Sequence, residues 1–374
     1  MSRARKYYLV AGEASGDLHG ANLIKAIKAI DEDADIRCWG GDLMRDAGGE
    51  LVSHYRERAF MGLWEVIKNI RTISGFLHKA KEDILAWKPD VLVLIDNPGF
   101  NMRIAKFAHE KGIPVHYYIA PKVWAWNTGR VKGIHAYVDA LYSILPFEID
   151  FFKKHGVDAV YVGNPVMDEV ATFNHSQHTK SQYADSQINI ALLPGSRANE
   201  IDNAMPVMLE LAARKPDWNF RVAVAPSFDR SFYNRYTLLP NMELCEGKTY
   251  KVLSGSTAAV VTSGTATLET ALLNVPQVVC YRVAALTYAI GRRVIKVPYI
   301  SLVNLILNKP AVPELIQADF TAEKIGKQLE GLVNGPERQA QLDDYSLLAS
   351  QVGGPGASAR VAEAVVGFVK KLRK

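Results

Sequence analysis

One segment of the chain, residues 261–269, has the pattern of an apolar strand, a turn of small residues and the start of a helix. In that turn, Ser263, Gly264 and Thr265 would present backbone N–H groups at a helix N-terminus, where an anion is stabilised. Glu269 lies four residues after Thr265 on the same helical face, within reach of the ribose of a nucleotide whose phosphates bind the turn. The alternative interpretation, a capped core helix without a ligand, fits this segment equally well.

A second loop, residues 12–20, follows the first apolar run of the chain and contains three glycines, the carboxylates of Glu13 and Asp17 and the hydroxyl of Ser15. Its glycines are four residues apart, which differs from the Gly-x-Gly-x-x-Gly pattern of dinucleotide sites. Ser15 also stands one place late for a nucleophile elbow. We favour a sugar-binding loop, and the simpler alternative is a strand–helix turn capped by Ser15 or Asp17.

Asp96 directly follows the apolar run 91–95, and Asn97-Pro98 then turns the chain. A carboxylate at the end of a buried strand, beside apolar neighbours, can have a raised pKa and act as a general base. An Asx turn or a helix cap at this position is the alternative.

Arg197 ends the turn Pro194-Gly195-Ser196-Arg197, which follows another apolar run. A guanidinium fork suits a diphosphate, and the amides of the turn would assist it. A cation is disfavoured beside the positive end of a helix dipole unless an anion binds there, which favours a binding role over the alternative of a solvated side chain.

Short apolar runs alternate with helical patterns along the chain, which predicts a doubly wound parallel sheet. The expected strands of a first domain are 7–11, 91–95, 115–119 and 141–145, and its helices include 18–30, 103–111 and 131–138. A second series of strands is expected at 188–193, 220–225, 258–262 and 277–281. The simplest architecture is two Rossmann-like domains that face each other across a cleft, with the four loops above at the carboxyl ends of their strands.

The polar segment 172–187 contains no Leu, Ile or Val and is interpreted as a linker. The predicted organisation is therefore an N-terminal domain over 1–170, a linker over 171–187, a second domain over 188–345 and a helical segment over 346–374. A Gly-Gly-Pro-Gly bend at 353–356 precedes the last helix, expected over 359–372. We expect that helix to cross back to the first domain or to be exchanged between the subunits of a homodimer.

Composition excludes several classes of protein. The 374 residues carry a net charge of +5, which suits an anionic small substrate or an anionic membrane surface and is too weak to indicate nucleic acid. The three cysteines are far apart and the histidines form no ligand pair, so neither disulfides nor a metal site is predicted. Without a Gly-x-Gly-x-x-Gly turn, a nicotinamide-dependent redox enzyme is disfavoured, and no cofactor is expected.

Two apolar segments are candidates for an interfacial surface. Met61, Leu63 and Trp64 lie in a strongly apolar run, for which burial in the core is the alternative. Trp124 and Trp126 stand between Lys122 and Arg130, a combination that is typical of a membrane-facing or acyl-chain surface. No run is long enough to span a membrane and no signal peptide is evident, so a cytoplasmic location with a peripheral membrane role is predicted.

These segments together resemble one family, the lipid-A-disaccharide synthases, which are bacterial glycosyltransferases of the two-Rossmann (GT-B) type. The matching residues run in order from about residue 9 to about residue 316. They are Gly12-Glu13-Ala14-Ser15-Gly16-Asp17, Ile95-Asp96, Val123-Trp124-Ala125-Trp126, Leu145-Pro146-Phe147-Glu148, Leu193-Pro194-Gly195-Ser196-Arg197, Ser263-Gly264-Thr265-Ala266, Tyr281-Arg282, Tyr299-Ile300-Ser301-Leu302 and Asn304.

The resemblance implies transfer of 2,3-diacylglucosamine from its UDP derivative to the 6-hydroxyl of 2,3-diacylglucosamine 1-phosphate, which yields a β-1,6 disaccharide and UDP. It points to Asp96 as the base, with Glu13 as the other candidate, and it places Glu13 and Ser15 in the acceptor or sugar pocket. UDP binding maps onto the second domain, at residues Arg197, Ser263, Gly264, Thr265, Glu269, Arg282 and Asn304. Because the substrates carry acyl chains, it also implies a peripheral site on the inner face of the cytoplasmic membrane.

Other functions share parts of this pattern. A UDP-N-acetylglucosamine 2-epimerase or another UDP-sugar transferase of the GT-B type would share the segment 263–269, but an epimerase should place further carboxylates and a histidine around the sugar. A non-catalytic membrane adaptor that binds a nucleotide would not need Asp96.

Overall fold

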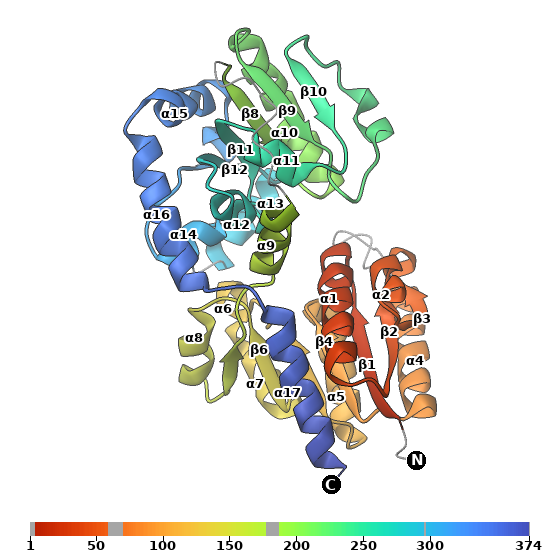
Figure 1. Cartoon of the computed structure of the whole chain (residues 1–374). Helices are drawn as coiled ribbons and strands as arrows, with labels where there is room; N and C mark the ends of the chain where they lie inside the picture. Colours follow the sequence, from red (N-terminus) through yellow and green to blue (C-terminus); the bar gives the residue numbers. More distant parts are fainter. Residues whose placement is uncertain (1–3, 59–69, 177–186, 295–296, 374) are drawn as a thin grey trace. The chain divides into compact units, whose positions relative to one another are not determined.

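The computed structural model describes residues 4–58, 70–176, 187–294 and 297–373. The chain divides into two compact units, one made of Met1–Pro165 with Pro355–Lys374 and the other of Val166–Gly354. Each unit is an α/β domain built on one parallel sheet (Figure 1). The predicted fold class is therefore confirmed.

The sheet of the first domain has the strand order β3-β2-β1-β4-β5-β6-β7 among the described residues, and all its pairs are parallel. Its strands are β1 (Arg5–Ala11), β2 (Ala34–Gly40), β3 (Glu50–His54), β4 (Val91–Ile95), β5 (Val115–Tyr118), β6 (Ala140–Ser143) and β7 (Ala159–Tyr161). The helices of this domain are α1 (Ala14–Ile30), α2 (Asp42–Asp46), α4 (Ile70–Trp87), α5 (Pro98–Glu110), α6 (Val123–Trp126), α7 (Val131–Tyr137), α8 (Glu148–Lys154) and α17 (Ala357–Leu372), with 3-10 turns at Tyr55–Arg58 and Thr128–Arg130.

Helices cover both faces of this sheet, and its central strand β4 is apolar throughout. β4 is wholly buried, as expected of a parallel strand with helices on both sides. In β1, Tyr7 and Leu9 join the core on one face, whereas Tyr8 and Val10 join the core on the other.

The last helix of the chain, α17, completes the first of these two cores. Val361, Val365 and Val369 recur every four residues and form one buried face, which packs with α1. Burying one such side chain contributes about 1.5–3 kcal/mol. The C-terminal segment is thus an integral part of the first domain, beside α1 in Figure 1.

The sheet of the second domain has the order β10-β9-β8-β11-β12-β13 among the described residues and is also parallel. Its strands are β8 (Asn189–Leu193), β9 (Asn219–Ala223), β10 (Met242–Cys245), β11 (Ala258–Thr262), β12 (Gln277–Tyr281) and β13 (Glu314–Ile316). The helices are α9 (Val166–Ser176), α10 (Ala198–Arg214), α11 (Thr249–Ser254), α12 (Thr265–Leu272), α13 (Ala285–Val294), α14 (Leu302–Leu307), α15 (Ala322–Asn334) and α16 (Glu337–Val352), with 3-10 turns at Arg230–Arg235 and Gln317–Asp319.

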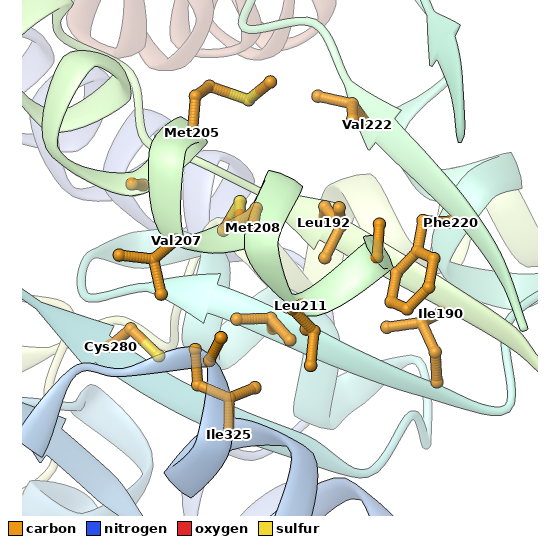
Figure 2. Packing of buried hydrophobic residues seen from close by; sticks show 14 of the residues in the cluster. Ile190, Leu192, Met205, Val207, Met208, Leu211, Phe220, Val222, Cys280 and Ile325 are labelled. Atoms are coloured by element: carbon orange, nitrogen blue, oxygen red, sulfur yellow. The ribbon is translucent and has the colours of Figure 1, made fainter. Parts of the chain in front are cut away.

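The main core of the second domain lies between this sheet and the helices α10 and α15 (Figure 2). Met208 and Leu211 of α10 pack over Ile190 and Leu192 of β8, and Ile325 comes from α15. This packing holds the strands whose ends carry the second set of predicted ligand loops.

The boundaries of the domains differ from those predicted. The expected linker 171–187 begins inside α9, a helix of the second domain that buries Val166 and Val170 and continues to Ser176. Residues 177–186 lie outside the described part of the chain. The expected boundary at 346 falls inside α16, which continues to Val352. Polar composition was misleading at the linker, because α9 buries Val166 and Val170 although most of its other residues are polar. At 346 the helix continues, because the Gly-Gly-Pro-Gly bend that ends α16 comes only at 353–356.

Candidate active site

The loops after β1 and β4 leave the first sheet side by side. Ala11 and Ile95 are paired across the two strands, so Gly12 and Asp96 follow at neighbouring positions. The chain continues from β1 towards β2 and from β4 towards β5, in opposite directions along the sheet. This is the topological switch point, where ligands bind in doubly wound folds.

The two loops touch, and the contact requires a glycine. A Cβ atom on Gly12 would lie 1.9 Å from Nδ2 of Asn97. Any larger residue at position 12 would therefore displace the Asn97 side chain and the turn that carries Asp96.

Asp96 lies in a turn whose backbone conformation is unusual and is stabilised by two side chains of the same domain. Asp96 and Asn97 have φ values of 46° and 45°, in the left-handed region. The Asp96 carbonyl accepts a hydrogen bond from Nδ2 of Asn101 at 2.8 Å and another from the Tyr117 hydroxyl. Both of these anchors bind the main chain of Asp96.

A cavity of about 200 Å³ adjoins this turn. Its lining residues come from the loops after two adjacent strands, β4 and β5, and from the 3-10 turn before α7. They are Asp96, Pro98, Pro121, Lys122, Val123 and Arg130. A carboxylate beside two cations suits proton transfer from an anionic substrate, because the cations attract the substrate that the base must meet.

Glu13 and Ser15 stand at the start of α1, and both are exposed. Glu13 occupies the cap position without a capping hydrogen bond from its side chain. Neither Ser15 nor Asp17 caps α1, so that alternative is wrong. Asp17 is buried and accepts hydrogen bonds from the backbone N–H groups of Gly41, Leu43 and Met44, where it caps the start of α2.

Trp124 is half-buried and is held from inside the domain. Its indole Nε1 donates a hydrogen bond to Oε1 of Glu148 at 2.8 Å. Its ring packs edge-on against the Phe147 ring, with 4.9 Å between the ring centroids. Trp126 lies in the same short helix, α6. The other predicted surface residues, Met61, Leu63 and Trp64, lie outside the described part of the chain.

From the sequence, Glu148 appeared as the last residue of the family-like segment Leu145-Pro146-Phe147-Glu148, with no role of its own. It is 1% exposed and also accepts a hydrogen bond from the Ser143 hydroxyl. Burial raises its pKa to about 7, although its hydrogen bonds and the charge of Lys122 act in the opposite direction. Apart from that segment, its sequence signal was a glutamate in the first turn of a helix, which is common on protein surfaces.

The second domain has the same arrangement at its own switch point, between β8 and β11. Gly264 and Thr265 are exposed at the N-terminus of α12, and the half-buried Ser263 donates a hydrogen bond from Oγ to the Ile300 carbonyl at 2.9 Å. The N–H groups of Gly264 and Thr265 open the helix and are directed to where an anion would bind. The Ser263 N–H, predicted to be part of this anion site, instead donates a hydrogen bond to the Cys280 carbonyl at 2.9 Å.

Arg197 follows β8 and is exposed, with its guanidinium 3.7 Å from Oε1 of Glu200. Glu200 also accepts hydrogen bonds from the backbone N–H groups of Ser196 and Arg197, which shapes the turn. Gly195 has a φ of 122°, and a Cβ there would lie 2.5 Å from the Glu200 side chain. This turn therefore requires glycine.

Glu269 is half-buried one turn into α12. Its pKa is raised to about 7, mainly by burial and in addition by the nearby charge of Glu169 on α9, while a hydrogen bond from Tyr250 acts in the opposite direction. A carboxyl group in this state can accept or donate a hydrogen bond to a hydroxyl ligand near neutral pH.

Two residues predicted on the nucleotide side have internal structural roles. Arg282 donates hydrogen bonds to the carbonyls of Gln317 and Phe320 and lies over the Phe320 ring. Asn304 is 1% exposed, and its amide is bonded to the main chain of Val312 and to Glu314. Both amide atoms of Asn304 are thus bonded within the protein, which disagrees with its predicted contact with the nucleotide. Arg282 uses Nη2 for both of its bonds, so its contact with the nucleotide stays a prediction.

The sequence associated Lys122 and Arg130 with a membrane-facing surface, but the structure puts them on the cavity beside Asp96. A signal was available, because residues 119–122 follow a strand that neighbours the one before Asp96, and parallel strands end at one edge of a sheet.

Two doubly wound domains with ligand loops at both switch points define the GT-B class. The structure is similar over 97% of its length to UDP-GlcNAc 2-epimerase from Neisseria meningitidis, of which it covers 100%, with a TM-score of 0.66 and 13% identity. It is similar over 98% of its length to the glycosyltransferase of kitacinnamycin, of which it covers 99%, with a TM-score of 0.64 and 14% identity. At such identities the likeness establishes the fold alone.

Sequence comparison establishes the family. The family model for lipid-A-disaccharide synthetase matches residues 7–366. The lipid-A-disaccharide synthase of Syntrophus aciditrophicus is 39% identical, with 97% of both chains covered. That of Myxococcus xanthus is also 39% identical, with 98% of both covered. The chain belongs to the lipid-A-disaccharide synthetase family, so it is a glycosyltransferase, and the epimerase alternative is not favoured.

Proposed function

We propose that the chain transfers 2,3-diacylglucosamine from its UDP derivative to the 6-hydroxyl of 2,3-diacylglucosamine 1-phosphate, producing the β-1,6 disaccharide of lipid A and UDP. Membership of the family and the names of its relatives support the reaction. The main structural support for the site is the Asp96 turn, which Asn101 holds by a hydrogen bond and which borders a cavity at the switch point of the first sheet.

In this proposal Asp96 is the base. It takes the proton of the acceptor 6-hydroxyl as that oxygen attacks the anomeric carbon of the donor. The bond from the anomeric carbon to the diphosphate breaks in the same displacement, which inverts the configuration, and UDP leaves with the electron pair. Glu13 and Ser15, exposed on the neighbouring loop, contact the sugar, and Glu13 is the alternative base.

The second domain stabilises the leaving group. The N–H groups of Gly264 and Thr265 at the start of α12 and the guanidinium of Arg197 would bind the diphosphate, where negative charge increases in the transition state. Glu269 would bind the ribose hydroxyls. Arg282 supports this site indirectly, because it ties the end of β12 to the chain after β13. Asn304 does so through the 301–314 loop.

We also propose that the enzyme works on the inner face of the cytoplasmic membrane, where an anionic surface meets the segment of Met61, Leu63 and Trp64, with Trp124 and Trp126 near the acyl chains. Among the described residues, no helix is long and apolar enough to cross a membrane. Serine replacements at 61, 63 and 64 should reduce sedimentation with anionic vesicles and leave UDP binding intact. Equal sedimentation of variant and parent would contradict the membrane role.

A homodimer that exchanges the C-terminal segment is a further proposal, supported by the large apolar face that α17 presents to α1. Analytical ultracentrifugation tests it, since a monomer at micromolar concentration would exclude the exchange.

The decisive experiment combines UDP-2,3-diacylglucosamine with 2,3-diacylglucosamine 1-phosphate and detects disaccharide and UDP by mass spectrometry. Asp96→Asn retains the main-chain hydrogen bonds of the turn and removes the base, so turnover should fall by roughly 10²–10⁴-fold while UDP still binds. Asp158→Asn, an exposed change in the same domain, is the matched control and should retain activity. Full activity of Asp96→Asn would exclude Asp96 as the base.

A further inference from the structure

The cavity beside Asp96 has an excess of positive charge that proton transfer alone does not need. Two cationic side chains, Lys122 and Arg130, line it together with one carboxylate. Lys122 and Arg130 are both exposed and accessible to a ligand.

The main chain that carries Lys122 is fixed. Lys122 precedes α6, whose Val123 N–H donates a hydrogen bond to the Pro121 carbonyl at 2.7 Å. One residue further, Trp124 is bonded to the buried Glu148 at 2.8 Å. The short helix is thus anchored to the start of α8, and the ammonium group extends from a rigid base.

The acceptor of the proposed reaction carries an anion at a defined place. Its 6-hydroxyl and its 1-phosphate are attached on either side of the ring oxygen of one sugar, so a hydroxyl at Asp96 leaves the phosphate within the same cavity. A phosphate monoester has a charge of about −1.5 to −2 at neutral pH and accepts several charge-assisted hydrogen bonds. The donor diphosphate has its own candidate site on the second domain, at Arg197 and the start of α12.

We propose that Lys122 and Arg130 bind the phosphate monoester of the acceptor and make the enzyme selective for a phosphorylated acceptor sugar. This inference rests on the proposed function. A phosphodiester of an anionic membrane lipid has related chemistry, and the experiment separates the two sources.

The test compares two acceptors in neutral detergent micelles, 2,3-diacylglucosamine 1-phosphate and the same sugar without phosphate, with saturating donor. Lys122→Ala and Arg130→Ala should each lower kcat/KM for the phosphorylated acceptor by about 10- to 100-fold, mainly through KM, because one charge-assisted interaction is lost. With the unphosphorylated acceptor each variant should match the parent within about twofold, and the KM for the donor should stay unchanged. Lys132→Ala removes an exposed charge on α7 away from the cavity lining and is the matched control.

Lys122→Arg retains the charge and should restore most of the selectivity. Equal losses on both acceptors, or no loss on either, would overturn the inference. So would an effect that appears only on vesicles containing phosphatidylglycerol and is absent from neutral micelles, because it would assign the two cations to a membrane lipid.

Calorimetric binding of both acceptors in the absence of donor separates this inference from the proposed function. If the parent forms no disaccharide but still binds the phosphorylated sugar more tightly, with the difference lost in Lys122→Ala, the transfer reaction is refuted and the phosphate site stands. If turnover is normal and the two acceptors bind equally well to parent and variants, the phosphate site is refuted and the transfer reaction stands.

Discussion

The buried carboxyl group of Glu148 should make the first domain less stable as the pH rises, and Glu148→Gln isolates this effect. The side chain is 1% exposed and accepts hydrogen bonds from Trp124 and Ser143. Glutamine has the same shape, and its amide oxygen can still accept the Trp124 bond. The substitution therefore removes the ionisation and retains the anchor of α6.

The magnitude follows from the change in pKa on folding. Burial raises the pKa of Glu148 from 4.5 to about 7. Between these values the folded protein binds more protons than the unfolded chain, so stability falls as the pH rises. The contribution is fully present below pH 4.5 and is lost above pH 7. A gap of about 2.5 units corresponds to about 3 kcal/mol.

Urea denaturation between pH 5 and pH 8, followed by circular dichroism, measures this difference. The free energy of unfolding of Glu148→Gln minus that of the parent should increase with pH by up to about 3 kcal/mol. Glu269, whose pKa is also raised, is present in both proteins and cancels in the difference. Asp150→Asn, an exposed change on the same helix, should leave the pH dependence unchanged.

Parallel pH profiles for Glu148→Gln and the parent would refute the reasoning. They would mean that the Glu148 carboxyl group ionises in the folded protein without a cost in free energy. Such a result would require a polar environment, which a side chain that is 1% exposed does not have. A loss of stability in Glu148→Gln that is the same at every pH would instead indicate that glutamine forms poorer hydrogen bonds at this position. The change of the free energy of unfolding with pH would still decide the question.

Two further predictions concern the turns that shape the candidate site. Asp17→Ala leaves three backbone N–H groups at the start of α2 without their acceptor and should lower the free energy of unfolding by about 1–3 kcal/mol, whereas the exposed Asp46→Ala should change it by less than about 0.5 kcal/mol in urea denaturation. Gly195→Ala introduces a Cβ at a φ of 122° and 2.5 Å from Glu200, so it should cost about 1–3 kcal/mol and weaken UDP binding in a calorimetric titration. Gly367→Ala, in α17 with open space around it, is the control and should be neutral or stabilising, and unaltered UDP binding by Gly195→Ala would contradict the role of its turn.

Apolar runs predicted the central strands well. The predicted strands 91–95, 258–262 and 277–281 coincide with β4, β11 and β12, because a parallel strand covered on both faces must be apolar along its whole length. The strands β2, β3, β7, β10 and β13 were not predicted. β3, β7, β10 and β13 lie at the edges of the described sheets, and β2 is next to one, where charged residues such as Arg37 and Glu243 are tolerated.

The candidate site was predicted as a set of loops and not as a set of contacts. Asp96 and Gly12 could be placed at the end of their strands, but only the pairing of β1 with β4 brings their loops together. Arg282 and Asn304 show the opposite case, since the family resemblance assigned them to the nucleotide side and the fold also bonds them internally. The hydrogen-bond partner of a side chain is often a residue distant in sequence. The spacing of residues along the chain does not show which residues these are.

The sequence by itself determined the class of fold, the loops at the strand ends and the family, because these follow from local hydrophobic periodicity and from short segments whose order is preserved along the chain. Only the tertiary structure decided that Asp17 caps α2, that Glu148 is buried behind Trp124, and that Lys122 and Arg130 line the Asp96 cavity. Each of these depends on how strands and helices far apart in the chain pack, and therefore on which polar groups are removed from water together.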